Sequence, residues 1–205
     1  MSGILITQSL ISSWNYAMNS REECQEEAYQ SFLDTLHKIP KEQTPEMLNG
    51  ILFEDEVYRA ARGEPRDAHE KWEAGIQSVA SIVRGAPFQI RLSRHLRVSG
   101  EDLLVYGVLD SMKAGTIYDV KFLNKSFGSA DLAGKYLDSP QHPAYLFLAP
   151  EALDFVYLVS DGKDLYTERY THKNTRPFAE IAAEFLDFLR VANLFDTYKE
   201  LWYAK

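Results

Sequence analysis

The sequence predicts a single α/β domain in which helices flank a mixed β-sheet. Three consecutive segments rich in β-branched and aromatic residues are separated by short glycine-containing turns, as expected of antiparallel strands. Helical periodicity with N-cap signals precedes them, and two further strands and an amphipathic helix follow. With 205 residues, 45% of them hydrophobic, the chain is long enough to bury a core. We expect one domain over residues 1–205, with a mainly helical part at 1–85 and the sheet core and C-terminal helix at 86–205.

Composition excludes several classes of protein. The single cysteine, Cys24, rules out an internal disulfide and a four-cysteine zinc or iron–sulfur site. No apolar run approaches the roughly 20 residues of a membrane span, and the N-terminus lacks a signal-peptide pattern. These features predict a cytoplasmic protein without a membrane partner.

Charge is unevenly distributed along the chain. The net charge of −8 disfavours nucleic-acid binding on average, but residues 71–125 carry eight basic and five acidic side chains. A basic surface around an acidic metal site would suit a phosphodiester substrate. A basic block of this length also arises by chance, so on its own it does not establish a nucleic-acid substrate.

Four helices are predicted in the N-terminal part. A short helix capped by Thr7 or Ser9 begins the chain, and a second, over 21–38, begins with a run of acids that we interpret as a solvated face. A fourth helix is expected over about 67–83, ending at Gly85. The apolar residues that these three helices would bury are Leu10, Ile11, Trp14, Ala28, Phe32, Leu36, Trp72, Ile76, Val79 and Ile82 or Val83.

The third predicted helix contains a misplaced acid. Thr44 as N-cap and Pro45 at the first position start it, and it runs to about Arg62. Its apolar stripe would be Met47, Ile51, Glu54, Tyr58 and Ala61. A carboxylate at Glu54 facing a core is costly unless it is paired or binds a metal. The alternative is that the stripe is slightly rotated and Glu54 belongs to an acidic surface patch.

A hairpin at the centre of the chain brings two further acids together. Strands are predicted at 88–98, 103–112 and 116–123, and a two-residue turn at Ala114-Gly115 would place Asp110 directly opposite Asp119. Two like charges at that distance repel, which favours a cation between them. Lys121 shares the face of Asp119, two residues away. The alternative is an ordinary solvated hairpin face.

The remaining elements complete the predicted sheet. A loop and short helix at 124–138 lead to a helix capped by Ser139, on which Gln141 and Tyr145 share a face. Strands follow at 154–160 and 165–171. An amphipathic helix over about 177–192 is expected to pack against the sheet.

The order of these motifs resembles the PD-(D/E)XK nuclease superfamily, within it the RecB-like exonuclease branch, of the phage recombination type without an iron–sulfur cluster. The matching segments are Gly50-Ile-Leu-Phe-Glu54, Gly107-Val-Leu-Asp110, Asp119-Val120-Lys121 and Gln141-x-x-x-Tyr145. Leu109 replaces the proline that names the superfamily, and Pro143 interrupts the last motif. The resemblance implies a restriction-endonuclease-like core.

The resemblance also implies a metal-dependent active site. Hard oxygen ligands suit Mg²⁺ or Mn²⁺, which would activate water and polarise a phosphate, with Lys121 orienting or deprotonating that water or neutralising charge. The implied metal ligands are Glu54, Asp110, Asp119 and the carbonyl of Val120. The implied catalytic residues are Glu54, Asp110, Asp119, Lys121, Gln141 and Tyr145. The residues expected to contact DNA phosphates are Arg91, Arg94, Arg97, Lys125 and Lys135.

The function expected from the resemblance is a metal-dependent deoxyribonuclease, an exonuclease acting on DNA ends in recombination, repair or phage replication. Its partners would be DNA, double-stranded with a free end, and a homo-oligomer or a recombination partner protein. The alternative from another class is a catalytically inactive DNA-binding or assembly module on the same fold. A sequence-specific endonuclease is a third interpretation, less favoured because Gln141 and Tyr145 match the exonuclease branch.

Overall fold

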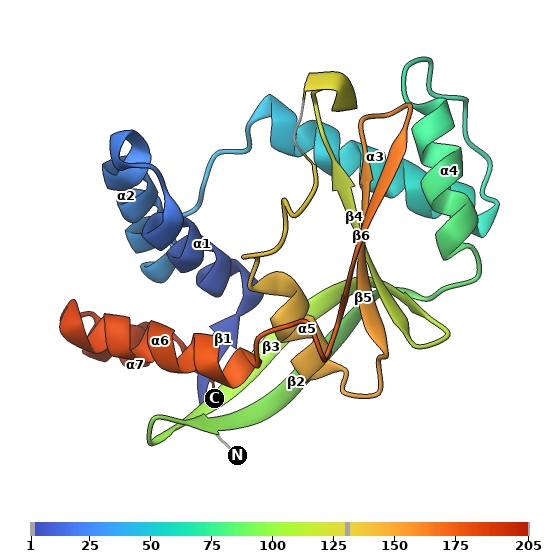
Figure 1. Cartoon of the computed structure of the whole chain (residues 1–205). Coiled ribbons are helices and arrows are strands. Elements are labelled where there is room, and N and C mark those ends of the chain that lie inside the picture. The colour runs from blue at the N-terminus through green and yellow to red at the C-terminus, as the bar shows by residue number, and fades with distance from the viewer. Residues whose placement is uncertain (1–2, 130–131, 205) are drawn as a thin grey trace.

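The computed structural model describes residues 3–129 and 132–204 (Figure 1). Its helices are α1 (Gln8–Asn19), α2 (Gln25–Leu36), α3 (Pro45–Arg62), α4 (Glu73–Val83), α5 (Gln141–Leu148), α6 (Phe178–Val191) and α7 (Phe195–Leu201). Its strands are β1 (Gly3–Thr7), β2 (Phe88–Val98), β3 (Glu101–Lys113), β4 (Thr116–Phe122), β5 (Asp154–Ser160), β6 (Leu165–Thr171) and β7 (Tyr203–Ala204). No helix in these ranges is both long and apolar enough to cross a membrane. The predicted α/β class with a mixed sheet is confirmed.

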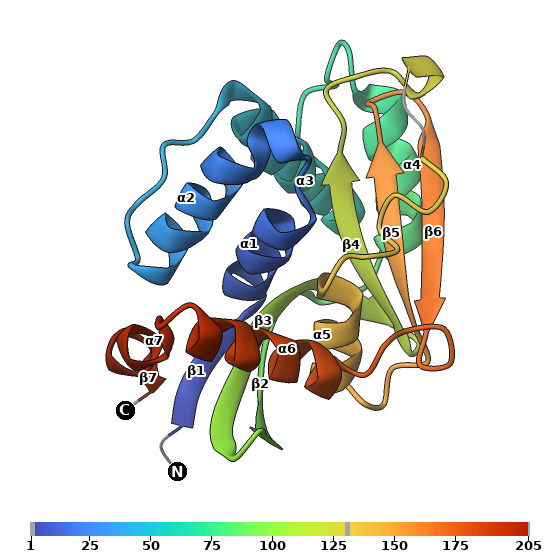
Figure 2. The same cartoon turned by 60° about the vertical axis from the view of Figure 1, so that its left-hand side comes forward.

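Strand β3 organises the sheet. The strand order is β6-β5-β4-β3-β1-β7, and β2 pairs with β3 along its other edge. On the edge away from β2, β1 runs parallel to residues 103–106 of β3, whereas β4 pairs antiparallel with residues 111–113. Between these two segments the described ladders leave residues 107–110 without a strand partner on that edge. The sheet therefore forks at β3, and β1 and β4 diverge from it (Figure 2).

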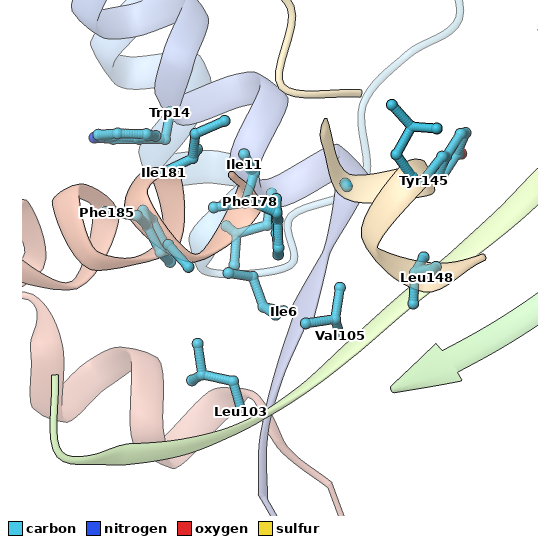
Figure 3. Close-up of a cluster of buried hydrophobic side chains, with 14 of the residues drawn as sticks. Ile6, Ile11, Trp14, Leu103, Val105, Tyr145, Leu148, Phe178, Ile181 and Phe185 are labelled. Carbon is cyan, nitrogen blue, oxygen red and sulfur yellow. The ribbon is translucent and has the colours of Figure 1, made fainter. Parts of the chain in front are cut away.

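A large core lies on the side of the sheet covered by α1, α2, α5 and α6. Helix α6 packs against the N-terminal helices through aromatic rings, with the Phe185 centroid 5.5 Å from that of Trp14 and 6.5 Å from that of Phe32. Figure 3 shows that side chains from α1, α5, α6 and the β1–β3 pair meet in this cluster. We call it the large core. It fixes α5 against β3.

A smaller core lies between α3, α4 and the strands β4 and β5. Phe53 and Val57 of α3 and Ile76 of α4 are fully buried there against Val120 of β4. The ring of Phe53 stacks on that of Phe122 at 4.7 Å. We call this cluster the small core, and in Figure 1 its two helices stand apart from α1 and α2.

Most predicted elements are present, with some corrections. The N-terminal part also contains a strand, β1, which the predicted short helix and its apolar start did not indicate. The fourth helix begins at Glu73 rather than near 67. At the C-terminus, α7 and β7 follow the predicted helix α6. Helix α6 packs on α1 and α2 as well as on the sheet.

The predicted stripe of α3 is rotated. Met47 and Ile51 are half exposed, at 51% and 52%, because the buried positions are Phe53, Val57, Tyr58 and Ala61. The rotation of the stripe agrees with the alternative interpretation, but the exposed acidic patch that this interpretation implied for Glu54 is not observed. Glu54 is half buried at the edge of that face.

Candidate active site

The central hairpin has the predicted register. Lys113 pairs with Thr116 across a two-residue turn in which Ala114 and Gly115 have φ values of 50° and 82°, both left-handed, as the mirror-image hairpin turn requires. The described ladder ends one pair before Asp110 and Asp119 would face each other. Instead, the carboxylate of Asp110 accepts a hydrogen bond from the backbone N–H of Val120 at 2.9 Å.

Asp119 is the most deeply buried acid of the group, with 1% of its surface exposed. Its Oδ1 accepts a hydrogen bond from the Gln141 amide. Its Oδ2 forms an ion pair with Lys121 Nζ at 2.7 Å, but accepts no well-oriented hydrogen bond from the described residues. A buried carboxylate oxygen with only one contact leaves room in its coordination for a cation.

Helix α5 closes the fork of the sheet. A side chain at Gly107 would approach the ring of Tyr145 to 2.7 Å, so glycine is required for this helix to pack on β3. The Tyr145 hydroxyl donates to the carbonyl of Val108 at 2.9 Å, in the segment that lacks a strand partner on the edge away from β2. Pro143, which interrupts the Gln141–Tyr145 motif, lies in the first turn of α5, where its missing N–H costs no helical hydrogen bond. Gln141 and Tyr145 thus both reach the fork.

Glu54 reaches the site from the small core. Its Oε1 accepts hydrogen bonds from the hydroxyl of Tyr58, one turn later on α3, and from the Gln89 amide on β2 at 3.0 Å. The sequence pattern indicates Tyr58 only as a member of the apolar stripe of α3 and does not indicate a role for Gln89. The i,i+4 spacing of Glu54 and Tyr58 could have indicated their contact, whereas Gln89 is distant in sequence and carried no signal.

Burial raises the pKa values of all three acids, and repulsion between the acids adds to the shift for Asp110 and Glu54. Burial raises the pKa of Asp110 well above its ordinary value, and the charges of Asp119 and Glu54 add to the shift. Burial likewise raises the pKa of Glu54, and that of Asp119 despite the opposing charge of Lys121. Burial alone would lower the pKa of Lys121, but Asp119 and Asp110 outweigh it and hold that pKa above its ordinary value. The site therefore contains three interacting acids and one ammonium group.

This donor set fits a hard divalent cation by its chemistry. Carboxylates and a backbone carbonyl, here that of Val120, are the ligands that Mg²⁺ and Mn²⁺ prefer. Within residues 3–129 and 132–204, no three His, Cys, Asp or Glu side chains are already close enough to one another to hold a metal ion. The assignment of Glu54, Asp110 and Asp119 as ligands stays a prediction.

The predicted DNA-binding residues are not brought together. Arg91 and Arg97 lie exposed on β2, on the side away from the core-facing residues Ile90, Leu92 and Leu96. Arg94 lies on the opposite side. There it donates to the carbonyl of Phe147 at 2.8 Å, and its guanidinium lies 4.8 Å from the Phe147 ring centroid. The remaining two, Lys125 and Lys135, are exposed in the segment after β4.

The architecture is that of the restriction-endonuclease-like nuclease fold seen in PD-(D/E)XK nucleases. No protein-family model matches the sequence, and no curated protein matches it. The crystal structure of SSO0001 is similar with a TM-score of 0.52 and 12% identity, over 91% of this chain and 76% of that one. LHK-Exo, an alkaline exonuclease from Laribacter hongkongensis, crystallised in complex with dAMP, is similar with a TM-score of 0.54 and 13% identity, over 96% of this chain and 90% of that one. These likenesses show the fold.

Proposed function

We propose that the protein is a metal-dependent deoxyribonuclease that hydrolyses phosphodiester bonds. The observation that carries this proposal is the fork of the sheet, where the buried Asp119–Lys121 pair lies beside Asp110 and is held by Gln141. A purely structural sheet has no need of acids that repel one another in a buried position. The similarity to LHK-Exo, which its name describes as an alkaline exonuclease, supports the same activity.

Asp110, Asp119, Glu54 and the carbonyl of Val120 would hold Mg²⁺ or Mn²⁺. The bound metal would supply an activated water and polarise the scissile phosphate. Lys121, charged and one-third exposed, is suited to stabilise negative charge that develops on the phosphate. Gln141 orients Asp119, and Tyr145 holds β3 at Val108, on the edge where β3 has no neighbouring strand.

The substrate would be DNA with a free end, and double-stranded DNA is favoured. Arg91, Arg97, Lys125 and Lys135 are exposed cations available to contact phosphates; Arg91 lies opposite Val108 at the fork, whereas Arg97 lies opposite Asp102, farther along the β2–β3 pair. Arg94 is the weakest of the five predicted contacts because its guanidinium already bonds to Phe147. A role in recombination, repair or phage replication, alone or as an oligomer, belongs to the same proposal.

The proposal is tested by incubating the protein with linear and with closed circular DNA in Mg²⁺, Mn²⁺ or EDTA. We expect loss of linear DNA with either metal, no loss with EDTA and survival of the circles. Intact linear DNA under every metal condition would contradict the proposal.

The non-catalytic alternative makes a different prediction in the same assay. A DNA-binding module would bind DNA equally well with and without Lys121→Ala, and no substrate would disappear. Cutting of circular DNA into discrete fragments would instead favour a sequence-specific endonuclease.

A further inference from the structure

The backbone of β2 is distorted at one residue beside the candidate active site. Gln89 has a φ of 55°, a left-handed conformation that is rare for a residue with a long side chain inside a strand. The ladder with β3 is regular on both sides, from Phe88–Ser111 to Ile90–Leu109, but skips the pair between them. The skipped partner of Gln89 is Asp110, one of the three acids.

The distortion has a structural consequence of its own. Phe88 packs in the small core, where its ring lies 4.5 Å from that of Tyr58, whereas Ile90 packs against the large core. A regular strand would direct both side chains to the same face. The left-handed residue between them therefore lets β2 pass from one core to the other, and glycine could serve this purpose with less strain.

The side chain of Gln89 does something that glycine could not. It is exposed, yet its amide donates to Glu54 Oε1 at 3.0 Å and lies 3.4 Å from the Tyr58 hydroxyl. Tyr58, 6% exposed, donates to the same carboxylate oxygen. Two donors from two different elements thus fix Oε1, while Oε2 accepts no hydrogen bond from the described residues.

We infer that Gln89 and Tyr58 are positioning residues that hold the Glu54 carboxylate by one oxygen and leave the other for the metal. This inference rests on the proposed function. A carboxylate on a half-exposed helix has several rotamers, and two fixed donors reduce them to one before the metal arrives. Hydrogen-bond partners of metal ligands commonly change metal affinity by 10- to 100-fold when they are removed.

The experiment distinguishes the role of the Gln89 side chain from that of its left-handed backbone conformation. Gln89→Gly keeps the left-handed conformation and removes the amide, and Tyr58→Phe removes only a hydroxyl while keeping the ring packed on Phe88. Binding of Mn²⁺ without DNA is measured by electron paramagnetic resonance titration, and thermal unfolding confirms that each variant is folded. We expect the dissociation constant to rise about tenfold for each variant.

Tyr170→Phe is the matched control. Tyr170 also donates its hydroxyl to a glutamate, Glu168, which lies on β6, two strands from Asp119, and takes no part in the hydrogen bonds of the three acids among the described residues. Its removal should leave Mn²⁺ affinity unchanged.

Two results would overturn the inference, and they can be told apart. If wild-type protein binds Mn²⁺ and Gln89→Gly and Tyr58→Phe bind it equally well, the two residues serve only packing, and the proposed function stands. If wild-type protein does not bind Mn²⁺, the proposed function fails and this inference fails with it.

Discussion

The large core and the small core contribute different parts of the candidate active site. The large core, rich in aromatic rings, holds α5 and with it Gln141 and Tyr145. The small core holds α3 and with it Glu54. Asp110 and Asp119 lie between them, where the sheet forks.

This difference explains where charges can be buried in the molecule. Burying three interacting acids raises their pKa values and costs free energy, so neither core could accept them in its interior. At the boundary, donors from both sides are available: Gln141 and the Val120 N–H for the aspartates, Tyr58 and Gln89 for Glu54. A functional site of this kind requires both cores to be correctly placed.

The largest expected effect on DNA cleavage comes from substituting Lys121, which lies at the boundary between the two cores. Lys121→Ala removes the ammonium paired with Asp119, and we expect metal-dependent cleavage of linear DNA to fall by about 10²–10³-fold, as for other losses of transition-state charge stabilisation. Lys163→Ala, in the exposed turn between β5 and β6, is the control and should cleave normally. Normal cleavage by Lys121→Ala would show that Lys121, and the site between the two cores to which it belongs, takes no part in catalysis.

The two cores can be weakened separately. Phe53→Ala in the small core and Phe185→Ala in the large core each remove a fully buried ring, and each should cost about 3–5 kcal/mol of stability in denaturant titrations. Only Phe53→Ala, next to Glu54, should also weaken Mn²⁺ binding under conditions where both variants are folded. Equal loss of Mn²⁺ affinity in both would show that the cores do not divide the site as described.

The large core also contains a buried histidine on α5. Burial lowers the pKa of His142 from 6.5 to about 4. Between these values the unfolded chain binds a proton that the folded protein does not. The contribution of His142 to the free energy of unfolding is therefore fully present above pH 6.5. It falls by about 3 kcal/mol as the pH is lowered from 6.5 to about 4.

His142→Phe isolates this contribution, since a phenyl ring can replace the imidazole in its stack on Tyr170. The difference in unfolding free energy between wild type and variant should change by that amount between pH 7 and pH 4. A difference independent of pH would mean that the imidazole titrates normally.

The smallest expected effect concerns the two sides of β2. Arg91→Ala should reduce by about one the slope of the logarithm of the DNA-binding constant against the logarithm of salt concentration, because one exposed cation that contacts a phosphate is lost. Arg94→Ala should change it less, since that guanidinium packs on Phe147. Fluorescence anisotropy across a salt series measures both, and a larger effect of Arg94→Ala would reverse the assignment of the two sides.

Local signals predicted much of this fold. The Ala114-Gly115 turn determined the hairpin register, and Thr7 and Thr44 cap their helices as expected. The strand β1 could not be predicted, because it is five residues long and merges into α1 at Thr7. The rotation of α3 depends on which face meets β4, and the Met47–Ile51 side of its helix is itself apolar.

The candidate site was predictable where it depends on register and motif order, and not where it depends on tertiary contacts. The proximity of Asp119 and Lys121 follows from strand alternation, and their ion pair is present. The contacts of Gln89 with Glu54 and of Tyr145 with Val108 arise only once the strands and helices have packed. The same alternation places Arg94 on the opposite side of β2 from Arg91, but the contact of Arg94 with Phe147 could not be predicted from the sequence.

The most direct test of the account is an anomalous-difference map from crystals soaked in Mn²⁺. We predict a peak at the fork of the sheet, within about 2.2 Å of carboxylate oxygens of Asp110 and Asp119. A map without a peak there, under conditions in which the protein binds Mn²⁺ in solution, would contradict the account.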